Sequence, residues 1–370
     1  MTGARTVLLG DVCKFVGGGT PSRAQPEYFQ GDIPWATVKD FKTFLISDTE
    51  EHISEVAIAD SATNIINPGT VLLVTRVGLG KVAIAGRRLA INQDVKAVTP
   101  TDDVLPEFLF WFLLSKANDI QRMGAGATVK GVTLNDIKSI TMPLPTLPEQ
   151  RRIVDILSRA EGIVRLRSEA EKKAAELIPA LFLDTFGDPA RNPKGWPTVP
   201  FGELVNNRDG KRKPIKSADR DHRQGQYPYY GASGIIDTYD DYLFDGEHLL
   251  IAEDGANLLS RSTPISFIAT GKFWVNNHAH VVAANGKVNL TFLECLLNLR
   301  DLKDFITGSA QPKLNQANLN GIPIVNCPLP MQKKFATQVE QIRSIQSQQS
   351  VATATAQATF DALLSKAFSK

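Results

Sequence analysis

Two long stretches of the chain carry apolar residues at the spacing of a single helix face. In residues 148–186 the apolar positions recur close to every 3.5 residues, and charged residues fill most positions between them. In residues 330–368 a similar stripe runs through a background rich in Gln, Ala and Thr. A narrow apolar stripe on a helix of this length favours packing against another helix. Pro179 predicts a kink near the end of the first helix, and Gly187 is expected to end it.

The apolar stripes supply the residues that we expect at a helix–helix seam or at a face that binds partner proteins. These residues are Ile153, Ile156, Ile163, Leu177, Leu181, Phe335, Val339, Ile342, Phe360 and Leu363. One interpretation is that each helix packs separately on its own domain. Two long helices with matching stripes favour instead an antiparallel pair that acts as a spacer.

The stretch before each long helix has shorter patterns, interrupted by turn residues. In residues 1–146 the patterns predict strands at 70–75, 81–85 and 94–99. Residues 106–114 form an apolar helix that begins with proline, which is tolerated in the first helical turn. Residues 191–328 have the same mixed character, so two mixed α/β domains are expected.

The chain also repeats itself at a fixed offset. Gln150 matches Gln332, an offset of 332 − 150 = 182, and the same offset pairs Phe186 with Phe368. A period of this length indicates two copies of a domain-plus-helix unit related by a pseudo-twofold axis. The expected fold class is α+β, with two globular mixed α/β domains in pseudo-twofold repeat, joined by two long antiparallel coiled-coil helices. The expected segments are a first domain at 1–146, a central spacer helix at 147–190, a second domain at 191–328 and a C-terminal spacer helix at 329–370.

Composition narrows the class of protein. The net charge is only +2, so any nucleic-acid surface must come from local clusters of cations. The three cysteines, Cys13, Cys295 and Cys327, have neither disulfide nor metal-ligand spacing. The longest apolar run, residues 108–114, is too short to span a membrane, and the first ten residues lack the apolar core of a signal peptide. We therefore expect a cytoplasmic protein with no membrane partner.

Several local motifs resemble those of one known family. In the first domain they are residues 17–23 (GGGTPSR) and 31–35 (GDIPW), and in the second they are 229–236 (YYGASGII) and 249–258 (LLIAEDGANL). Residues 143–150 (PLPTLPEQ) then lead into the first long helix. In this order the motifs resemble the specificity (S) subunit of type I restriction–modification systems, and the resemblance covers essentially the whole chain.

The resemblance implies a non-catalytic subunit that binds double-stranded DNA. Each mixed domain would be a target recognition domain for one half of a bipartite sequence, and the helices would set the gap between the halves. The helices would also dock two methyltransferase (modification) subunits, and the assembly would recruit motor-nuclease (restriction) subunits. No cofactor or metal is expected on this chain, since S-adenosylmethionine, ATP and Mg are expected on the partner subunits. The two domains diverge outside their last third, so the half-sites are expected to differ and the target to be asymmetric.

Candidate DNA contacts are polar and cationic residues near glycine-rich turns, because such side chains bond base edges and phosphates. In the first domain they are Thr20, Ser22, Arg23, Lys39, Arg76, Lys81, Asn92, Gln93 and Lys130. Arg76 and Lys81 bracket Gly78 and Gly80, where the backbone can approach a phosphate closely. The alternative for these two residues is that they are ordinary solvated charges of a hairpin.

The second domain has a stronger basic cluster and more aromatic residues. Its candidate contacts are Lys211, Arg212, Lys213, Tyr229, Tyr230, Ser233, Arg261, Asn276, Asn277, His278, Gln311, Lys313 and Asn315. The basic cluster at 211–216 could instead be a mobile solvated loop. A metal site at His278, His280 and Asp254 lacks a further ligand at a fitting spacing.

Two other functions are open to test against the sequence. A self-contained DNA methyltransferase needs a glycine-rich turn for its cofactor and an Asn/Asp-Pro-Pro-aromatic loop for a flipped adenine. The chain has no Pro-Pro dipeptide and no such glycine-rich turn, which argues against an enzyme. A scaffold of two interaction domains that does not bind DNA is the remaining alternative. Salt dependence separates the two, because DNA binding weakens steeply with salt.

Overall fold

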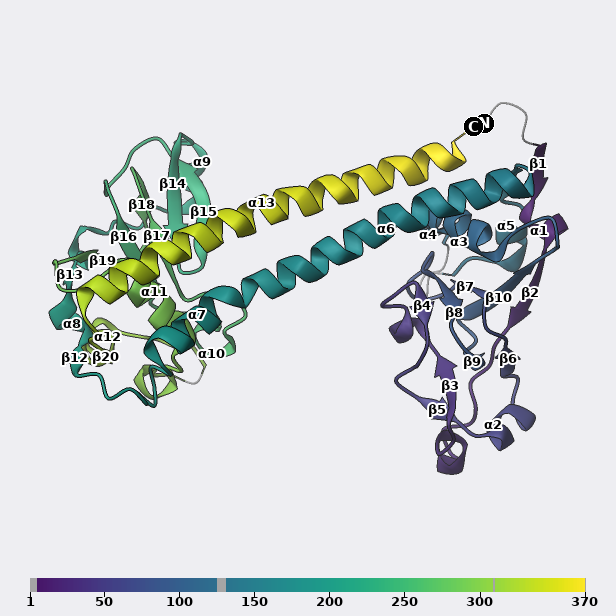
Figure 1. The fold of residues 1–370 in the computed structure, drawn as a ribbon, viewed down its shortest axis with the longest axis horizontal. Coiled ribbons are helices and arrows are strands. Elements are labelled where there is room, and N and C mark those ends of the chain that lie inside the picture. Colours follow the sequence, from purple (N-terminus) through teal and green to yellow (C-terminus); the bar gives the residue numbers. More distant parts are fainter. Residues whose placement is uncertain (1–4, 125–130, 309, 370) are drawn as a thin grey trace. The chain divides into compact units, whose positions relative to one another are not determined.

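The computed structural model describes residues 5–124, 131–308 and 310–369 (Figure 1). The chain forms two compact units, which we call unit 1 (Met1–Ser168 with Ala352–Lys370) and unit 2 (Glu169–Val351). Each unit contains one mixed α/β domain, one part of the central helical stretch and one part of the C-terminal helix. Each unit is therefore closed by helical segments from two distant parts of the sequence.

Unit 1 is built on a five-stranded sheet in the order β2-β10-β7-β8-β4. The strands are β2 (Cys13–Gly17), β10 (Val95–Pro100), β7 (Val71–Val74), β8 (Val82–Ala85) and β4 (Leu45–Ile46). Neighbouring strands are antiparallel except β4 and β8, which are parallel. A second, four-stranded sheet has the order β5-β3-β9-β6. Its strands are β5 (His52–Ile53), β3 (Ile33–Ala36), β9 (Leu89–Ile91) and β6 (Asn64–Ile66).

Strand β7 shows why its apolar run is continuous rather than alternating. Val71 and Leu73 belong to the core formed with helix α3 (Pro106–Ser115), while Leu72 and Val74 belong to the core formed with β9. Successive side chains of a strand point to opposite faces, and both faces of this sheet are covered. A further antiparallel pair joins β1 (Arg5–Leu8) to β11 (Thr141–Leu144). The remaining short helices are α1 (Leu9–Val12), α2 (Glu55–Ala59), α4 (Ala117–Met123) and α5 (Leu134–Lys138).

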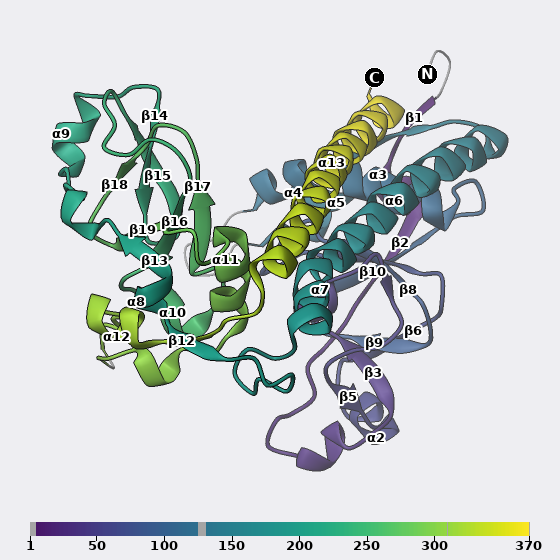
Figure 2. The same cartoon turned by 60° about the vertical axis from the view of Figure 1, so that its left-hand side comes forward.

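Unit 2 repeats this topology (Figures 1 and 2). Its main sheet contains β13 (Val205–Asn207), β19 (Ala279–Ala284), β16 (His248–Ala252) and β17 (Ser266–Ala269) in that order, and it corresponds to β2-β10-β7-β8. Its second sheet contains β15 (Gly234–Tyr239), β14 (Tyr227–Gly231) and β18 (Trp274–Val275). The pair β12 (Thr198–Pro200) and β20 (Pro323–Val325) corresponds to β1 and β11. Its short helices are α8 (Phe201–Leu204), α9 (Ser217–Asp221), α10 (Asn257–Ser260), α11 (Leu290–Leu299) and α12 (Gln316–Gly321).

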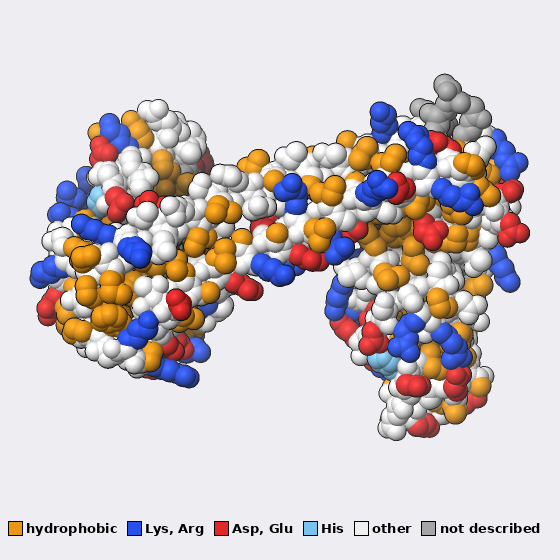
Figure 3. Space-filling view, in the orientation of Figure 1, with side chains coloured by type: hydrophobic (Ala, Val, Ile, Leu, Met, Phe, Trp, Pro, Cys, Tyr) orange, Lys and Arg blue, Asp and Glu red, His pale blue; other side chains and the backbone are white. Residues whose placement is uncertain are grey.

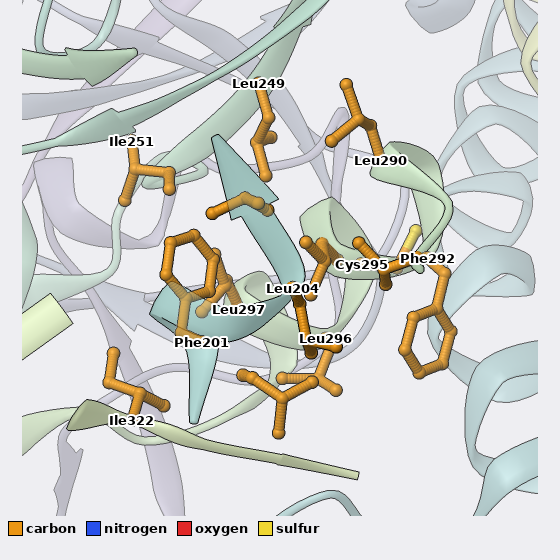
Figure 4. Packing of buried hydrophobic residues seen from close by; sticks show 14 of the residues in the cluster. Phe201, Leu204, Leu249, Ile251, Leu290, Phe292, Cys295, Leu296, Leu297 and Ile322 are labelled. Atoms are coloured by element: carbon orange, nitrogen blue, oxygen red, sulfur yellow. The ribbon is translucent and has the colours of Figure 1, made fainter. Parts of the chain in front are cut away.

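The core of unit 2 lies between the main sheet and α11. Leu249 and Ile251 of β16 point into it, while Leu250 points into a second core on the other face of the sheet. Figure 4 shows Phe201, Leu204 and Leu297 grouped in the first of these cores. The strand alternation is thus the same as in β7 of unit 1.

The long helical stretches are α6 (Leu147–Ala175), α7 (Leu177–Phe186) and α13 (Leu329–Phe368). The kink expected from Pro179 is a break at Glu176, about one turn before the proline. Pro179 therefore lies in the first turn of α7. In this position its missing N–H leaves no helical hydrogen bond unmade. Gly187 ends α7 with φ 83°, a conformation that favours glycine. The predicted strands and the helix at 106–114 are confirmed by β7, β8, β10 and α3.

The helix ends are anchored in the domain cores. In unit 1, Phe360 of α13 packs 5.7 Å, centroid to centroid, from Trp111 of α3. In unit 2, Phe335 of α13 packs 5.2 Å from Phe186 of α7. Val339 is fully buried in the same core. The two interpretations of the stripes are therefore both partly right, since stripe residues contact the other helix and also their own domain. The helical segments in each unit run antiparallel, as predicted.

The three cysteines are buried and unpaired. Burial raises the pKa of Cys13 and of Cys295 to about 12 and that of Cys327 to about 11. Their thiols are therefore poor nucleophiles at neutral pH, in line with a packing role. None of the helices in the described ranges is long and apolar enough to cross a membrane.

Candidate nucleic-acid interface

The same turn occurs in both units at the start of a central strand. In unit 1 it comprises residues 92–94, before β10, and in unit 2 residues 276–278, before β19. The Asn92 side-chain oxygen accepts from Asp94 N at 3.1 Å, and the Asn276 side-chain oxygen accepts from His278 N at 2.8 Å. We call each of these segments the Asn turn of its unit. The two asparagines are 6% and 7% exposed, so they shape the turn from inside.

Each Asn turn is bonded to the residues that follow the neighbouring strand. Thr75 N donates to Asp94 O at 2.8 Å in unit 1, and Glu253 N donates to His278 O at 2.9 Å in unit 2. The next residues, Arg76 and Asp254, form matching isolated bridges to Gly131 and Lys313. Arg76 and Asp254 are therefore structurally equivalent, and so are Asp94 and His278.

In unit 1 the Asn turn and the end of β7 bring several polar and charged side chains together. Arg76 Nε lies 3.7 Å from Asp94 Oδ1, and the Arg76 side chain is 51% exposed. Gln93 is exposed and is bonded to the hydroxyl of Thr20. Burial lowers the pKa of Lys96, and the nearby charge of Arg76 lowers it further. The chain turns sharply after Arg76, with φ 21° at Val77 and 88° at Gly78.

In unit 2 the equivalent location is an ion-pair network. Arg212 Nη1 lies 2.7 Å from Glu253 Oε2, and Lys313 Nζ lies 3.2 Å from Glu253 Oε1. His280, 1% exposed, bonds Asp209 Oδ2 at 2.6 Å and Leu314 O at 2.7 Å. Burial raises the pKa of Glu253, but the hydrogen bond from Arg212 and the charge of His280 outweigh it, so the net pKa is lowered. The carboxylate therefore stays ionised and holds the two cations in place.

Beside this network, Asp254 forms a pair with His278 of the Asn turn. His278 Nδ1 lies 2.9 Å from Asp254 Oδ2, and the His278 side chain is 50% exposed. Asn277 beside it is exposed, as Gln93 is in unit 1. Within the described ranges, no three His, Cys, Asp or Glu side chains are grouped so that they could hold a metal ion.

Other predicted contacts of unit 1 lie on its surface. Arg23 forms a bidentate pair with Glu51 at 2.5 and 2.7 Å and lies over the ring of Phe29. Trp35 is buried, and its Nε1 donates to Gly19 O at 3.2 Å, which fixes the glycine-rich loop. The remaining candidates Thr20, Ser22, Lys39 and Lys81 are exposed. Lys130 lies outside the described residues.

The predicted contacts of unit 2 divide into exposed and partly buried groups. The exposed residues are Lys211, Lys213, Ser233, Asn277, His278, Gln311 and Lys313. Tyr230 is partly buried, with its ring 5.6 Å from those of both Phe267 and Phe273. Asn315 caps α12 by accepting from Asn318 N at 2.9 Å.

Five of the predicted DNA contacts need correction, because their side chains are buried or make hydrogen bonds within the protein. Tyr229 is 0% exposed, and its hydroxyl accepts from Ile215 N at 3.0 Å. Arg212 is held by Glu253, and Arg261 donates to the carbonyls of Leu297 and Arg300 at the end of α11. Asn92 and Asn276 are the buried cores of the Asn turns. None of these side chains offers the open donor that direct base contact needs.

Lys96 and Asp94 are residues that the sequence did not single out. Both lie at the β10 end of the Asn turn, next to Arg76. Their proximity depends on the register of β10 against β7, in which Val95 pairs with Val74. The sequence signal that could have identified Lys96 is the alternation along β10, which places Lys96 on the opposite face from the buried Val95.

The helical segments of unit 1 enclose an apolar groove. It is lined mainly by Ile156, Ala160 and Ile163 of α6 and by Ala356 and Leu363 of α13. The side chains of Ile156 and Ile163 remain 37% and 52% exposed. Of the ten predicted seam residues, Ile153, Phe335, Val339 and Phe360 are buried, Leu181, Ile342 and Leu363 are partly buried, and Ile156, Ile163 and Leu177 are exposed.

Two similar domains, each with a polar turn at the end of its main sheet and each followed by a long helix, define a protein built from two copies of one module. The family model described as type I restriction modification DNA specificity domain matches residues 1–176 and 193–351. The chain therefore belongs to the family of type I restriction–modification specificity subunits, with two copies of the specificity domain.

Individual relatives agree with this family. The type I restriction enzyme MjaIX specificity subunit of Methanocaldococcus jannaschii is 26% identical over 374 residues, which cover 90% of this chain and 85% of that protein. The EcoR124I/EcoR124II specificity subunit of Escherichia coli is 32% identical over 176 residues, 46% of this chain and 44% of that protein. The crystal structure of a type I S subunit from M. genitalium has the same fold, with a TM-score of 0.65 at 15% identity, and covers 100% of this chain and 98% of that one.

Proposed function

We propose that this chain is the sequence-specific DNA-binding subunit of a type I restriction–modification complex. The domain of unit 1 recognises one half of a bipartite target, and the domain of unit 2 recognises the other half. The long helices set the gap between the halves and dock the methyltransferase subunits. The chain itself performs no chemistry, and S-adenosylmethionine, ATP and Mg are bound by the partner subunits.

The observation that carries this proposal is the pair of equivalent Asn turns with different exposed side chains. Both turns are held by the same backbone bonds, yet one displays Gln93, with Arg76 beside it, and the other displays Asn277 and His278. A shared backbone with different hydrogen-bonding groups is what two recognition surfaces for two different half-sites require. It also supports an asymmetric target.

The charge distribution supports a DNA-binding surface that this chain forms together with the methyltransferase subunits. Figure 3 shows Lys and Arg side chains interspersed with Asp and Glu on the visible face of each unit. With a net charge of +2, this chain supplies only part of the phosphate neutralisation that tight DNA binding needs. The rest is expected from the methyltransferase subunits.

Exposed apolar residues on the helices support docking of those subunits. Ile163, Leu166 and Leu177 are 52%, 58% and 48% exposed along the central helical stretch. Ile345 of α13 is 50% exposed. Apolar side chains at this density on a helix surface are typical of a face that a protein partner covers.

Competition binding at several salt concentrations tests the proposal. The purified complex of this chain with its methyltransferase subunits is titrated with a labelled genomic DNA pool, and bound fragments are sequenced. We expect enrichment of one bipartite sequence and a steep loss of affinity between 50 and 200 mM salt, roughly a thousand-fold for six phosphate contacts. Binding that neither selects a sequence nor responds to salt would support the scaffold alternative.

A further inference from the structure

The equivalent Arg76 and Asp254 carry opposite charges, and each is paired with a side chain of its Asn turn. In unit 1 the strand β7 is followed by the cation and the Asn turn supplies the anion, Asp94. In unit 2 the strand β16 is followed by the anion and the Asn turn supplies His278. The backbone bonds at the two places are the same, so the carboxylate and its partner have exchanged positions on one scaffold.

We propose that this exchanged pair determines which base edge each unit accepts, with Arg76 recognising guanine in one half-site and His278 recognising an exocyclic amino group in the other. The inference rests on the proposed function and assigns residues within it. The base edges concerned are those of the major groove, where guanine offers two acceptors and adenine and cytosine each offer an amino donor.

The geometry of Arg76 suits guanine. Its Nε lies 3.7 Å from Asp94 Oδ1, and its side chain is half exposed, so the guanidinium group is accessible to a ligand. Two parallel N–H donors fit the O6 and N7 acceptors of guanine. The Asp94 carboxylate restrains the side chain, which lowers the conformational entropy that Arg76 loses when it binds.

The geometry of His278 suits a donor on the base. Its Nδ1 is bonded to Asp254, which fixes the ring orientation and places the proton of a neutral ring on Nδ1. The other nitrogen, Nε2, then carries a lone pair and accepts a hydrogen bond. An acceptor at this position selects the amino group of adenine or cytosine over the O6 and O4 acceptors of guanine and thymine.

The carboxylates argue against phosphate as the ligand at these two places. Asp94 lies 3.7 Å from the Arg76 guanidinium, and Asp254 lies 2.9 Å from the His278 ring. A negative charge this close repels a phosphate and weakens its binding to the paired side chain. Base edges carry no net charge, so the same carboxylates do not repel them. Each pair is therefore better suited to a base than to the backbone.

The test compares five complexes assembled with the same methyltransferase subunits: the natural chain, R76Q, R76K, H278A and R88Q. Arg88 is the matched control, because it is also 51% exposed and has one carboxylate partner, Glu55. Arg88 lies between β8 and β9, directly before β9. It is therefore at the opposite end of the β7–β8 hairpin from Arg76. Each complex methylates a pool of randomised duplexes in vitro, and the modified duplexes are sequenced.

We expect the natural chain and R88Q to give the same bipartite motif. With R76Q and R76K, the preference for guanine at one position of one half-site falls by about ten-fold or more, while the other half-site is unchanged. R76K keeps the charge but loses the planar fork, so it separates base recognition from charge. The variant H278A is expected to relax one position of the opposite half-site only.

Other outcomes would overturn the inference. An unchanged motif with R76Q and R76K would show that Arg76 does not recognise a base, while the proposed function stands. A uniform loss of methylation over all sequences would place Arg76 on a phosphate or in the fold, and a thermal melt of each variant separates these two causes. Absence of a bipartite motif with the natural chain would instead contradict the proposed function itself.

Discussion

Gln150 and Gln332, one at the start of each long helix, make the same hydrogen bonds in their respective units. Gln150 Nε2 donates to Pro145 O at 3.0 Å, and its Oε1 accepts from Leu105 N at 2.9 Å. Gln332 Nε2 donates to Cys327 O at 2.8 Å, and its Oε1 accepts from Asn289 N at 2.9 Å. Both side chains are 0% exposed. These glutamines tie each helix to the domain that precedes it.

Replacing either glutamine by alanine is expected to destabilise its own unit. Gln150→Ala removes the side-chain partner of part-buried backbone groups at residues 103, 105 and 145, and a buried group left without a partner costs about 1–3 kcal/mol. Differential scanning calorimetry should show a lower melting temperature for Gln150→Ala and for Gln332→Ala. Gln357→Ala is the control, since Gln357 is exposed and its side chain donates to Asp361 on the same helix. Equal melting temperatures for all three variants and the natural chain would contradict this role.

A carboxylate on the edge strand β15 predicts how acid affects unit 2. The hydrogen bond from Arg220, 2.7 Å long, lowers the pKa of Asp237 from its usual value to about 2. Because the folded pKa lies below the unfolded pKa of about 3.9, the stabilisation is complete above pH 4 and is lost as pH falls towards 2. In the variant Asp237→Asn, the urea concentration at the unfolding midpoint should depend less on pH over this range. Asp221→Asn, at an exposed carboxylate of the same unit, should leave the dependence intact.

A buried carboxylate in α11 predicts the opposite pH dependence. Burial raises the pKa of Glu294, although Arg343 Nη2 lies 2.7 Å from its Oε1. Glu294 Oε2 has no hydrogen-bond partner in the described part of the chain. Since the folded pKa lies above the unfolded value, this residue costs stability as pH rises through its folded pKa. Glu294→Gln should therefore melt higher than the natural chain at pH 8 and show less difference at pH 4. A lower melting temperature at pH 8 would show that the ion pair with Arg343 outweighs burial.

Phosphate contacts are expected from exposed lysines near the Asn turn of unit 2. Replacing Lys211 and Lys213 together by alanine should weaken DNA binding of the complex for all sequences alike and reduce the salt slope by about 1 for each lysine. Fluorescence anisotropy at four salt concentrations gives both quantities. Lys366→Ala, at the end of α13, is the control and should change neither. A change in sequence preference would mean that these lysines contact bases.

Docking of methyltransferase subunits is expected to depend on the apolar face of α6. Ile163→Asp introduces a charge at a half-exposed position of the groove, and burying that charge in an interface is costly. Size-exclusion chromatography should show loss of the complex with an unchanged circular dichroism spectrum of the chain. Ile235→Asp, at a more exposed isoleucine of β15, is the matched control. Complex formation by Ile163→Asp at the natural level would exclude this face from docking.

Much of the architecture could be predicted from sequence because it follows from periodicity. The offset between Gln150 and Gln332 identifies the two copies, and the apolar run at 106–114 identifies α3. The break at Glu176 follows from Pro179, because proline disrupts the helical turn that precedes it. These features are local, so they leave a direct trace in the residue pattern.

The candidate interface could be predicted only in part, because residue type does not reveal burial. Arg212 and Lys213 are adjacent cations, yet Arg212 is drawn inward by Glu253 while Lys213 stays exposed. Tyr229 and Tyr230 alternate on β14, so one ring is fully buried and its neighbour only partly. The pairing of Arg76 with Asp94 depends on long-range strand register, which the sequence alone does not fix.

The most direct test of the proposed function is methylome sequencing of cells that express the cognate methyltransferase subunit with and without this chain. We expect one two-part asymmetric motif with a fixed unspecified gap, present only when this chain is expressed. Methylation that is the same without the chain, by a methyltransferase shown to be active, would contradict the proposed function.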